Sequence, residues 1–432
     1  MIGDPLLPVK RPRRIIQPNL DVVVDLLLPV LGTGRTRSEP EFVWGGKDLV
    51  ELPEGIGVIE PLDDDPWSVM KLVILEQCRR VAEGVGAARK EECGGPNRIF
   101  HDSSVDTGKK FDEGLVRKSD FDDPERMRTP DIRILGVPMG IGGGKPGTAM
   151  GPWKVREMAI VERLCSTLED AVIEDAGDVL AEEIEGISRL EQTARWCEAL
   201  KVRTMALAGQ GITPLVIGGD HTLAAGSLAG VASAHHARGD MIPGVLWIDA
   251  HVDMNTHETS PSGNPHGMSA AALLGLHVDH LDDVVGAAGR IDPTRVAFLG
   301  ARDIDPGEQR HIEELDLAVF SSEAIHENGV ERMVRDALRI VSPDGEPFMV
   351  SFDVDVIDPR FAPGVDTAVP GGLTPRQIEE TMKLVGGHGS MVAIDAVELN
   401  PETDVDEQTS ELMLRSLETL VRAAGAEASD RR

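Results

Sequence analysis

The chain has 432 residues, a length that allows one large domain with a buried core and an additional segment. Its 43 basic and 74 acidic residues give a formal net charge of −31, which argues against nucleic acid and anionic membranes as partners and is compatible with a cationic substrate. The four cysteines show no CxxC spacing, so we expect reduced thiols in a cytoplasmic protein.

The first 130 residues differ in composition from the rest of the chain. They contain a proline-rich start, one predicted helix from Trp67 to about Lys90, and a polar run rich in glycine and aspartate at 94–130. The longest early apolar stretch, 22–31, is interrupted by an aspartate and a proline and is too short to span a bilayer. We interpret residues 1–130 as an N-terminal extension that would wrap the main domain, support an oligomer contact or cover the mouth of a functional site.

From residue 131 onward, short apolar runs alternate with longer helical patterns, which is typical of βαβ units in a parallel sheet. The expected fold class is α/β, with three α-β-α layers and a mostly parallel central sheet over 131–424, followed by a C-terminal tail at 425–432. Strands are predicted at 131–138, 172–176, 214–217, 244–250, 295–301, 317–321, 347–353 and 391–397. Helices are predicted at 151–169, 183–209, 222–238, 308–315, 323–340, 374–385 and 407–424.

Three short blocks of acidic and histidine residues each follow an apolar run that we predict to be a buried parallel strand. The blocks are Gly218–His221, Asp249–Asp253 and Asp353–Asp355. Because strand side chains alternate with a period of two, the acids and the histidine of the second block should point the same way, as should the two acids of the third. A single Asp-x-Asp pair is usually a solvated strand end. Three blocks of acidic and histidine residues, each after an apolar run, are not explained as solvated strand ends.

The three blocks together supply two imidazoles and four carboxylates as expected metal ligands: His221, Asp249, His251, Asp253, Asp353 and Asp355. Asp220, which precedes the first of these histidines, is expected to be a loop acid rather than a ligand. Four carboxylates carry more negative charge than one divalent cation needs, and they suit two ions bridged by carboxylate and water. The pattern therefore indicates a binuclear metal hydrolase.

These blocks resemble the metal-binding signatures of the ureohydrolase superfamily, which includes arginase, agmatinase, guanidinobutyrase and formiminoglutamase. Three segments are more similar to arginase than to the other members: 249–267, 300–308 and 394–401. A fourth segment, 134–152, matches the first strand and loop of the same fold. The resemblance extends from about residue 131 to about 424. It implies a metal-dependent hydrolase of a guanidino group, with an arginase-like fold and a homotrimeric or homohexameric assembly.

The resemblance also assigns the metal ligands. Asp249 and Asp353 would bridge the two ions. His221 and Asp253 would complete the coordination of one ion, and His251 and Asp355 would complete that of the other. Carboxylate-rich ligation with two histidines favours two Mn²⁺ per subunit, while Ni²⁺, Co²⁺ or Zn²⁺ would be physically acceptable. A hydroxide bridging the two ions would attack the guanidinium carbon, and Asp253 would orient this hydroxide through a hydrogen bond.

Two further residues match catalytic positions of the family. Glu398 follows an apolar strand and would hold the planar guanidinium group through two parallel hydrogen bonds. His266 lies in a loop with the sequence Ser-Gly-Asn-Pro-His-Gly, and it matches the proton shuttle of the family. Its imidazole would protonate the leaving amine, because its pKa lies near the working pH.

Substrate choice is expected to depend on five outer residues. In arginases, positions matching Asn255 and Ser262 contact the α-carboxylate, and positions matching Asp305 and Glu308 contact the α-amino side. Thr367 matches a threonine near the guanidinium group. These matches favour L-arginine, hydrolysed to L-ornithine and urea, over a decarboxylated amine such as agmatine.

The chain departs from the family pattern at a few positions. Asp366 stands where the family usually has glycine, Ala368 where it usually has proline, and His257 where proline is common. We expect Asp366 to be exposed, although an added acid here could favour a different guanidine. The alternatives are therefore a hydrolase of another guanidino compound, such as guanidinobutyrate or agmatine, and a non-catalytic regulatory protein on an arginase scaffold. The complete ligand set argues against the second of these.

Overall fold

A computed structural model describes residues 131–168 and 171–430 of the chain. The extension predicted at 1–130, including its helix at 67–90, and the last two residues of the predicted tail lie outside the described residues. Within the described ranges, no helix combines the length and the apolar character needed to cross a bilayer.

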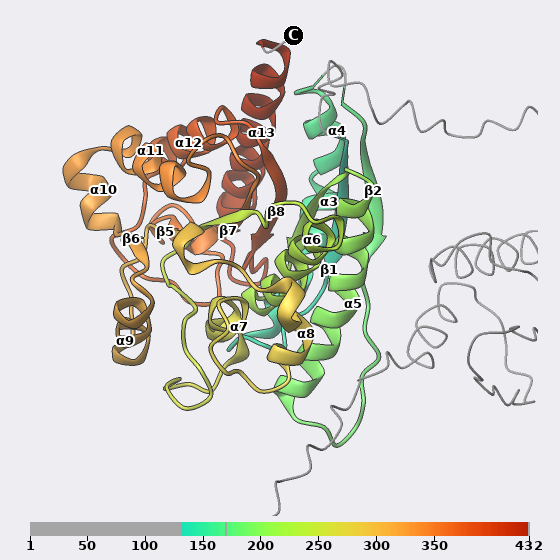
Figure 1. Cartoon of the computed structure of the whole chain (residues 1–432). Helices are drawn as coiled ribbons and strands as arrows, with labels where there is room; N and C mark the ends of the chain where they lie inside the picture. The colour runs from blue at the N-terminus through green and yellow to red at the C-terminus, as the bar shows by residue number, and fades with distance from the viewer. Residues whose placement is uncertain (1–130, 169–170, 431–432) are drawn as a thin grey trace, which may run out of the picture. The chain divides into compact units, whose positions relative to one another are not determined.

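The described residues form an eight-stranded sheet in which every neighbouring pair of strands is parallel (Figure 1). The strands follow the order β2-β1-β3-β8-β7-β4-β5-β6 across the sheet. Their bounds are β1 Ile132–Val137, β2 Ile173–Asp178, β3 Thr213–Gly218, β4 Gly244–Ile248, β5 Val296–Leu299, β6 Ala318–Phe320, β7 Phe348–Asp353 and β8 Met391–Val397. The predicted α/β class and all eight predicted strands are confirmed.

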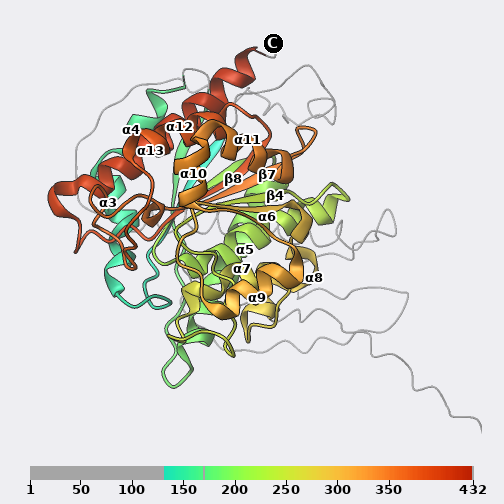
Figure 2. The same cartoon turned by 90° about the vertical axis from the view of Figure 1, so that its left-hand side faces the viewer.

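Helices cover both faces of this sheet, as Figure 2 shows. One layer contains α5, α6, α7 and α8, and the opposite layer contains α4, α11, α12 and α13. The helices that the structure describes are α3 Gly151–Glu157, α4 Ile160–Cys165, α5 Arg189–Gly209, α6 Ala224–Arg238, α7 Ser269–Leu273, α8 Leu281–Gly289, α9 Pro306–Leu315, α10 Ser322–Asn328, α11 Val330–Val341, α12 Pro375–Gly386 and α13 Gln408–Asp430. The predicted three-layer arrangement is confirmed.

Two predicted helices are broken in the structure. The helix predicted at 151–169 divides into α3 and α4, because Ala159 between them adopts a left-handed conformation with φ of 59°. The helix predicted at 323–340 divides into α10 and α11 at Gly329, where φ is 88°. The helix predicted at 407–424 continues to Asp430, and the short helices α7 and α8 were not predicted.

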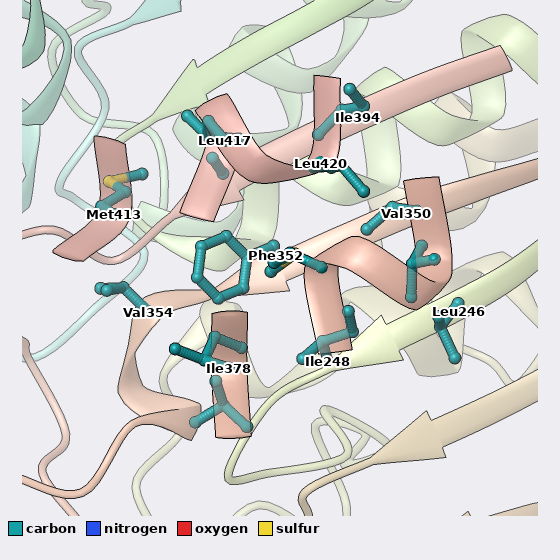
Figure 3. Packing of buried hydrophobic residues seen from close by; sticks show 14 of the residues in the cluster. Leu246, Ile248, Val350, Phe352, Val354, Ile378, Ile394, Met413, Leu417 and Leu420 are labelled. Carbon is teal, nitrogen blue, oxygen red and sulfur yellow. The ribbon is translucent and has the colours of Figure 1, made fainter. Parts of the chain in front are cut away.

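Alternating side chains of the central strands fill the two interfaces between the sheet and its helices. Leu246 and Ile248 of β4 and Phe352 of β7 belong to the same buried cluster as Ile378 of α12 and Leu417 of α13 (Figure 3). The intervening residues of the same strands pack toward the opposite layer of helices. The four central strands β3, β8, β7 and β4 are therefore anchored on both faces, and their carboxyl ends form a rigid edge that carries the residues described below.

Gly219, just after β3, is a position where the backbone leaves no room for a side chain. A Cβ atom here would lie 1.6 Å from the carbonyl oxygen of Met139. We predict that Gly219→Ala lowers the free energy of unfolding by about 3 kcal/mol or more, because backbone atoms would have to shift. Urea unfolding of both proteins measures the loss. Gly209→Ala is the control, since it meets nothing within 4 Å and should be neutral or slightly stabilising; equal stability of the two variants would contradict the close approach.

Candidate metal centre

The first group of candidate ligands surrounds His221, which follows β3. Its Nδ1 atom lies 3.1 Å from an Asp249 oxygen, 3.2 Å from an Asp253 oxygen and 3.2 Å from an Asp353 oxygen. All four side chains are buried. Residues at the carboxyl ends of three different strands therefore converge at one imidazole nitrogen.

A second group surrounds His251 in the loop after β4. Its Nδ1 atom lies 3.3 Å from Oδ1 of Asp249 and 3.1 Å from Oδ2 of Asp355. Asp249 belongs to both groups, since its other oxygen, Oδ2, faces His221. The structure thus brings all six predicted ligand residues together as two adjoining groups that share one carboxylate.

The chemistry of this donor set fits two divalent cations. The Nδ1 atom of His221 is buried and has no partner with hydrogen-bond geometry, although three carboxylate oxygens lie close to it. Its other nitrogen, Nε2, contacts the Ser351 hydroxyl at 2.8 Å, and this hydroxyl can accept a hydrogen bond from Nε2 when Nδ1 binds a cation. Trp247 stacks on the same imidazole ring at 4.3 Å and donates a hydrogen bond to Asp249. These contacts fix the orientation of the donors before any cation binds.

The local geometry differs from the predicted strand alternation. β4 ends at Ile248, so the block Asp249–Asp253 is a loop and a period of two cannot align its side chains. Asp249 instead accepts a hydrogen bond from the backbone of His251, and Asp253 adopts a positive φ of 49°. Convergence of the second block therefore comes from tight turns and a strained residue, which are common where a site imposes the conformation.

The electrostatics of the cluster follow from its burial. Burial raises the pKa of Asp353 well above its ordinary value, and the neighbouring Asp355 and Asp249 raise it further. Burial would lower the pKa of His221, but the carboxylates around it outweigh this effect and hold the pKa well above the usual range. A cluster that favours bound protons so strongly offers a favourable environment for other cations.

Glu398 and His266 lie together beside the first group. One Glu398 oxygen accepts a hydrogen bond from the backbone of His221 at 2.8 Å and lies 3.1 Å from His266 Nδ1. The other Glu398 oxygen is buried without a hydrogen-bond partner. Burial lowers the pKa of His266, but the contact with Glu398 outweighs it and raises the pKa to about 9. The pair therefore combines a carboxylate oxygen free to accept a hydrogen bond and an imidazole able to hold a proton.

The five predicted substrate contacts occupy two kinds of position. Asn255 is buried and donates to Asp305 at 2.9 Å, while Glu308 accepts from the backbone of Asp305 at the start of α9. Burial raises the pKa of Glu308 to about 7. Ser262 and Thr367 are exposed. The structure therefore joins three of these residues in one hydrogen-bonded group and leaves the other two open to solvent.

Two expectations concerned acids outside the ligand set. Asp220 is buried and caps the short turn that carries His221, accepting a hydrogen bond from the backbone of Thr222. This agrees with its expected role as a loop acid.

The expectation that Asp366 is exposed is wrong: the residue is 6% exposed and accepts hydrogen bonds from the backbone of Gly144 and Lys145. Sequence reasoning missed this loop as a partner, because the two segments are separated by more than 200 residues.

Sequence reasoning also missed the supporting contacts of Ser351 and Trp247. Both residues lie within buried strands, and they are directly paired in the register between β4 and β7. A lone serine inside the apolar run Phe348–Phe352 was the available signal, since a buried hydroxyl needs a hydrogen-bond partner.

Comparison with known proteins gives a consistent result. The model of the arginase family matches residues 130–422. An arginase from Bacillus caldovelox is 36% identical over 297 residues, which cover 67% of this chain and 97% of the relative. The crystal structure of an arginase from Bacillus subtilis superposes with a TM-score of 0.62 at 34% identity, covering 68% of this chain and 98% of that chain. The proclavaminate amidino hydrolase from Streptomyces clavuligerus superposes with a TM-score of 0.54 at 26% identity, covering 71% and 95% of the two chains.

Proposed function

The chain belongs to the arginase family, and we propose that it hydrolyses L-arginine to L-ornithine and urea with two Mn²⁺ per subunit. The family consists of binuclear metal-dependent enzymes that hydrolyse guanidino compounds, so the general reaction follows from membership. The observation that supports the proposal most strongly is the pair of His-carboxylate groups that share Asp249, with Glu398 and His266 beside them.

Two ions would be held by the six predicted residues: Asp249 and Asp353 would be shared, His221 and Asp253 would hold one ion, and His251 and Asp355 would hold the other. Two divalent ions, when bound, lower the pKa of water and so supply a nucleophile at neutral pH. The carboxylate-rich donor set favours Mn²⁺.

The remaining steps are assigned to side chains of the chain itself. Glu398 would bind the guanidinium group through its unpartnered oxygen and hold the group's plane in a fixed orientation. Asp253 would accept a hydrogen bond from the attacking water. His266, whose pKa is raised to about 9, would carry a proton at neutral pH and donate it to the leaving amine.

Substrate recognition is assigned to the mouth of the site. Ser262 and Asn255 would contact the α-carboxylate of an amino acid, and Asp305 and Glu308 would contact its α-amino side. Glu308 also accepts a hydrogen bond from the backbone of Asp305. Thr367 would lie near the guanidinium group. The buried Asp366, together with the similarity to an amidino hydrolase acting on another substrate, supports a second candidate, the hydrolysis of a different guanidino compound.

The assembly and location of the protein are also proposals. We propose a homotrimer or homohexamer, as the family resemblance implies, acting on a small cationic guanidino substrate. The two cysteines that the structure describes, Cys165 and Cys197, are unpaired, which supports a cytoplasmic location.

Urea release from L-arginine, agmatine and guanidinobutyrate, measured with protein loaded separately with Mn²⁺, Ni²⁺, Co²⁺ and Zn²⁺, tests the proposal. We expect L-arginine with Mn²⁺ to give the highest kcat/KM. A higher value for another guanidine would overturn the substrate assignment while keeping the metal centre. No urea from any pairing would overturn the function itself.

Ser262→Ala sharpens the substrate test. Loss of one hydrogen bond to a charged carboxylate should raise KM for L-arginine about tenfold with little change in kcat. Agmatine has no carboxylate and is the matched control, so its KM should change by less than about twofold. An equal increase for both substrates would show that Ser262 does not recognise the carboxylate.

A further inference from the structure

A glycine-rich loop at 141–145 lies against the segment that carries His266. The carbonyl oxygen of Gly142 accepts a hydrogen bond from the backbone nitrogen of His266 at 3.2 Å. The backbone nitrogen of Gly142 donates in turn to buried Asp220 at 2.9 Å. This loop is therefore hydrogen-bonded both to the backbone of His266 and to a buried acid.

Asp366 holds the other half of the same loop. Its Oδ2 atom accepts hydrogen bonds from the backbone nitrogens of Gly144 at 2.7 Å and Lys145 at 3.2 Å. The ammonium group of Lys145 donates to the backbone oxygen of Asp366 and lies 3.8 Å from its Oδ1 atom. A carboxylate oxygen of Asp366 also lies within 4.8 Å of ligand atoms of both His266 and Glu398.

The loop and the carboxylate are fitted to each other. A Cβ atom on Gly143 would lie 2.5 Å from Oδ2 of Asp366, and a Cβ atom on Gly142 would lie 2.4 Å from Oδ1 of Asp220. The run of glycines at 142–144 thus allows the backbone to approach two buried acids closely. Arg189 adds a third attachment, donating to the Gly143 carbonyl at 3.4 Å and to Asn264, two residues before His266, at 2.7 Å.

We propose that Asp366 is a positioning residue that holds loop 141–145 against His266 and thereby keeps the imidazole in place beside Glu398. Asp366 stands where the family usually has glycine. Its carboxylate accepts hydrogen bonds from loop 141–145 that a glycine, which has no side chain, cannot accept. The proposal rests on the proposed function, because it assigns Asp366 an effect on proton transfer through His266. A negative charge that contacts the substrate directly is the competing role.

Two variants separate these roles. Asp366→Ala removes the acceptor, and we expect kcat for L-arginine to fall about ten- to a hundredfold with KM changed by less than about twofold, since a displaced catalytic group affects turnover more than binding. Asp366→Asn keeps an oxygen that can accept both backbone hydrogen bonds, and it should restore kcat to within about threefold of the wild type. Asp366→Gly, the usual residue in the family, replaces the alanine variant if that protein does not fold.

A double-mutant cycle tests whether Asp366 acts through His266. In a His266→Ala background, adding Asp366→Ala should lower kcat by less than about twofold, because the positioned group is already absent. If kcat of the double variant instead falls by the product of the two single-variant losses, the proposal is overturned. Equal losses in Asp366→Asn and Asp366→Ala, with increased KM, would instead show that the negative charge contacts the substrate.

Hydrogen exchange of the metal-loaded full chain gives a readout that does not depend on turnover. Amides of 141–145 should exchange at least about tenfold faster in Asp366→Ala than in the wild type or in Asp366→Asn. Asp344→Ala, an exposed acid in the turn before β7, is the control and should leave this segment unchanged. Unchanged exchange at 141–145 in Asp366→Ala would overturn the positioning role of Asp366, whether or not the enzyme releases urea. Failure of this inference can therefore be told apart from failure of the proposed function.

Discussion

Asp249→Asn is expected to lower urea release at least about a thousandfold and to leave fewer than two metal ions per subunit. Asp249 is the residue common to both groups of candidate ligands, with Oδ2 facing His221 and Oδ1 facing His251. An asparagine has a single oxygen acceptor, so it cannot offer an anionic oxygen to each of two cations. Loss of the shared carboxylate should therefore affect both sites rather than one.

Metal analysis of the purified variant, together with urea release at saturating L-arginine, measures both effects. Asp395→Asn in β8 is a matched control, because Asp395 is a buried acid outside the ligand set. Burial raises its pKa to about 7, so the neutral form is already well populated at neutral pH and an amide should be tolerated. Two metal ions and near-normal turnover in Asp249→Asn would contradict the assignment of Asp249 as the shared ligand.

The ligand residues could be predicted from the sequence because each block immediately follows a short apolar run. Buried parallel strands give the clearest pattern in an α/β chain, and their carboxyl ends meet at one edge of the sheet. His221 and Asp353, which end up 3.2 Å apart, are separated by more than 130 residues. Their proximity follows from strand order, which no local pattern specifies, so the family resemblance supplied what periodicity could not.

Other features depended on contacts that the sequence pattern does not encode. The burial of Asp366 arises because loop 141–145 folds over it, and a single acid in a polar loop gives no sign of that partner. The period-two expectation for Asp249–Asp253 was wrong because the strand ends at Ile248, and one apolar run does not fix a strand's last residue to within a few positions. The break at Ala159 likewise has no glycine or proline to mark it.

Removing the metal ions is expected to lower the thermal midpoint by about 8 °C at neutral pH. Each ion held at about one hundred times its dissociation constant contributes about 2.7 kcal/mol to the folded state, and two ions contribute about 5 kcal/mol. For a domain of about 300 residues, each kcal/mol corresponds to about 1.6 °C in midpoint.

The difference between the metal-loaded and metal-free midpoints should widen as pH rises. Burial lowers the pKa of His221, but the neighbouring carboxylates outweigh this effect, so the pKa in the folded protein lies above 6.5. Protonation of His221 therefore stabilises the metal-free fold fully below pH 6.5. This stabilisation is lost as pH rises through the pKa of the folded protein. Metal ions need the deprotonated ligand, so they bind more tightly over the same range. Scanning calorimetry at about pH 6 and about pH 8.5, with chelator and with Mn²⁺, measures both differences. In Asp249→Asn, the metal-loaded and metal-free midpoints should differ by less than in the wild type at each pH. Equal midpoints with and without metal in the wild type would contradict metal binding at this buried cluster.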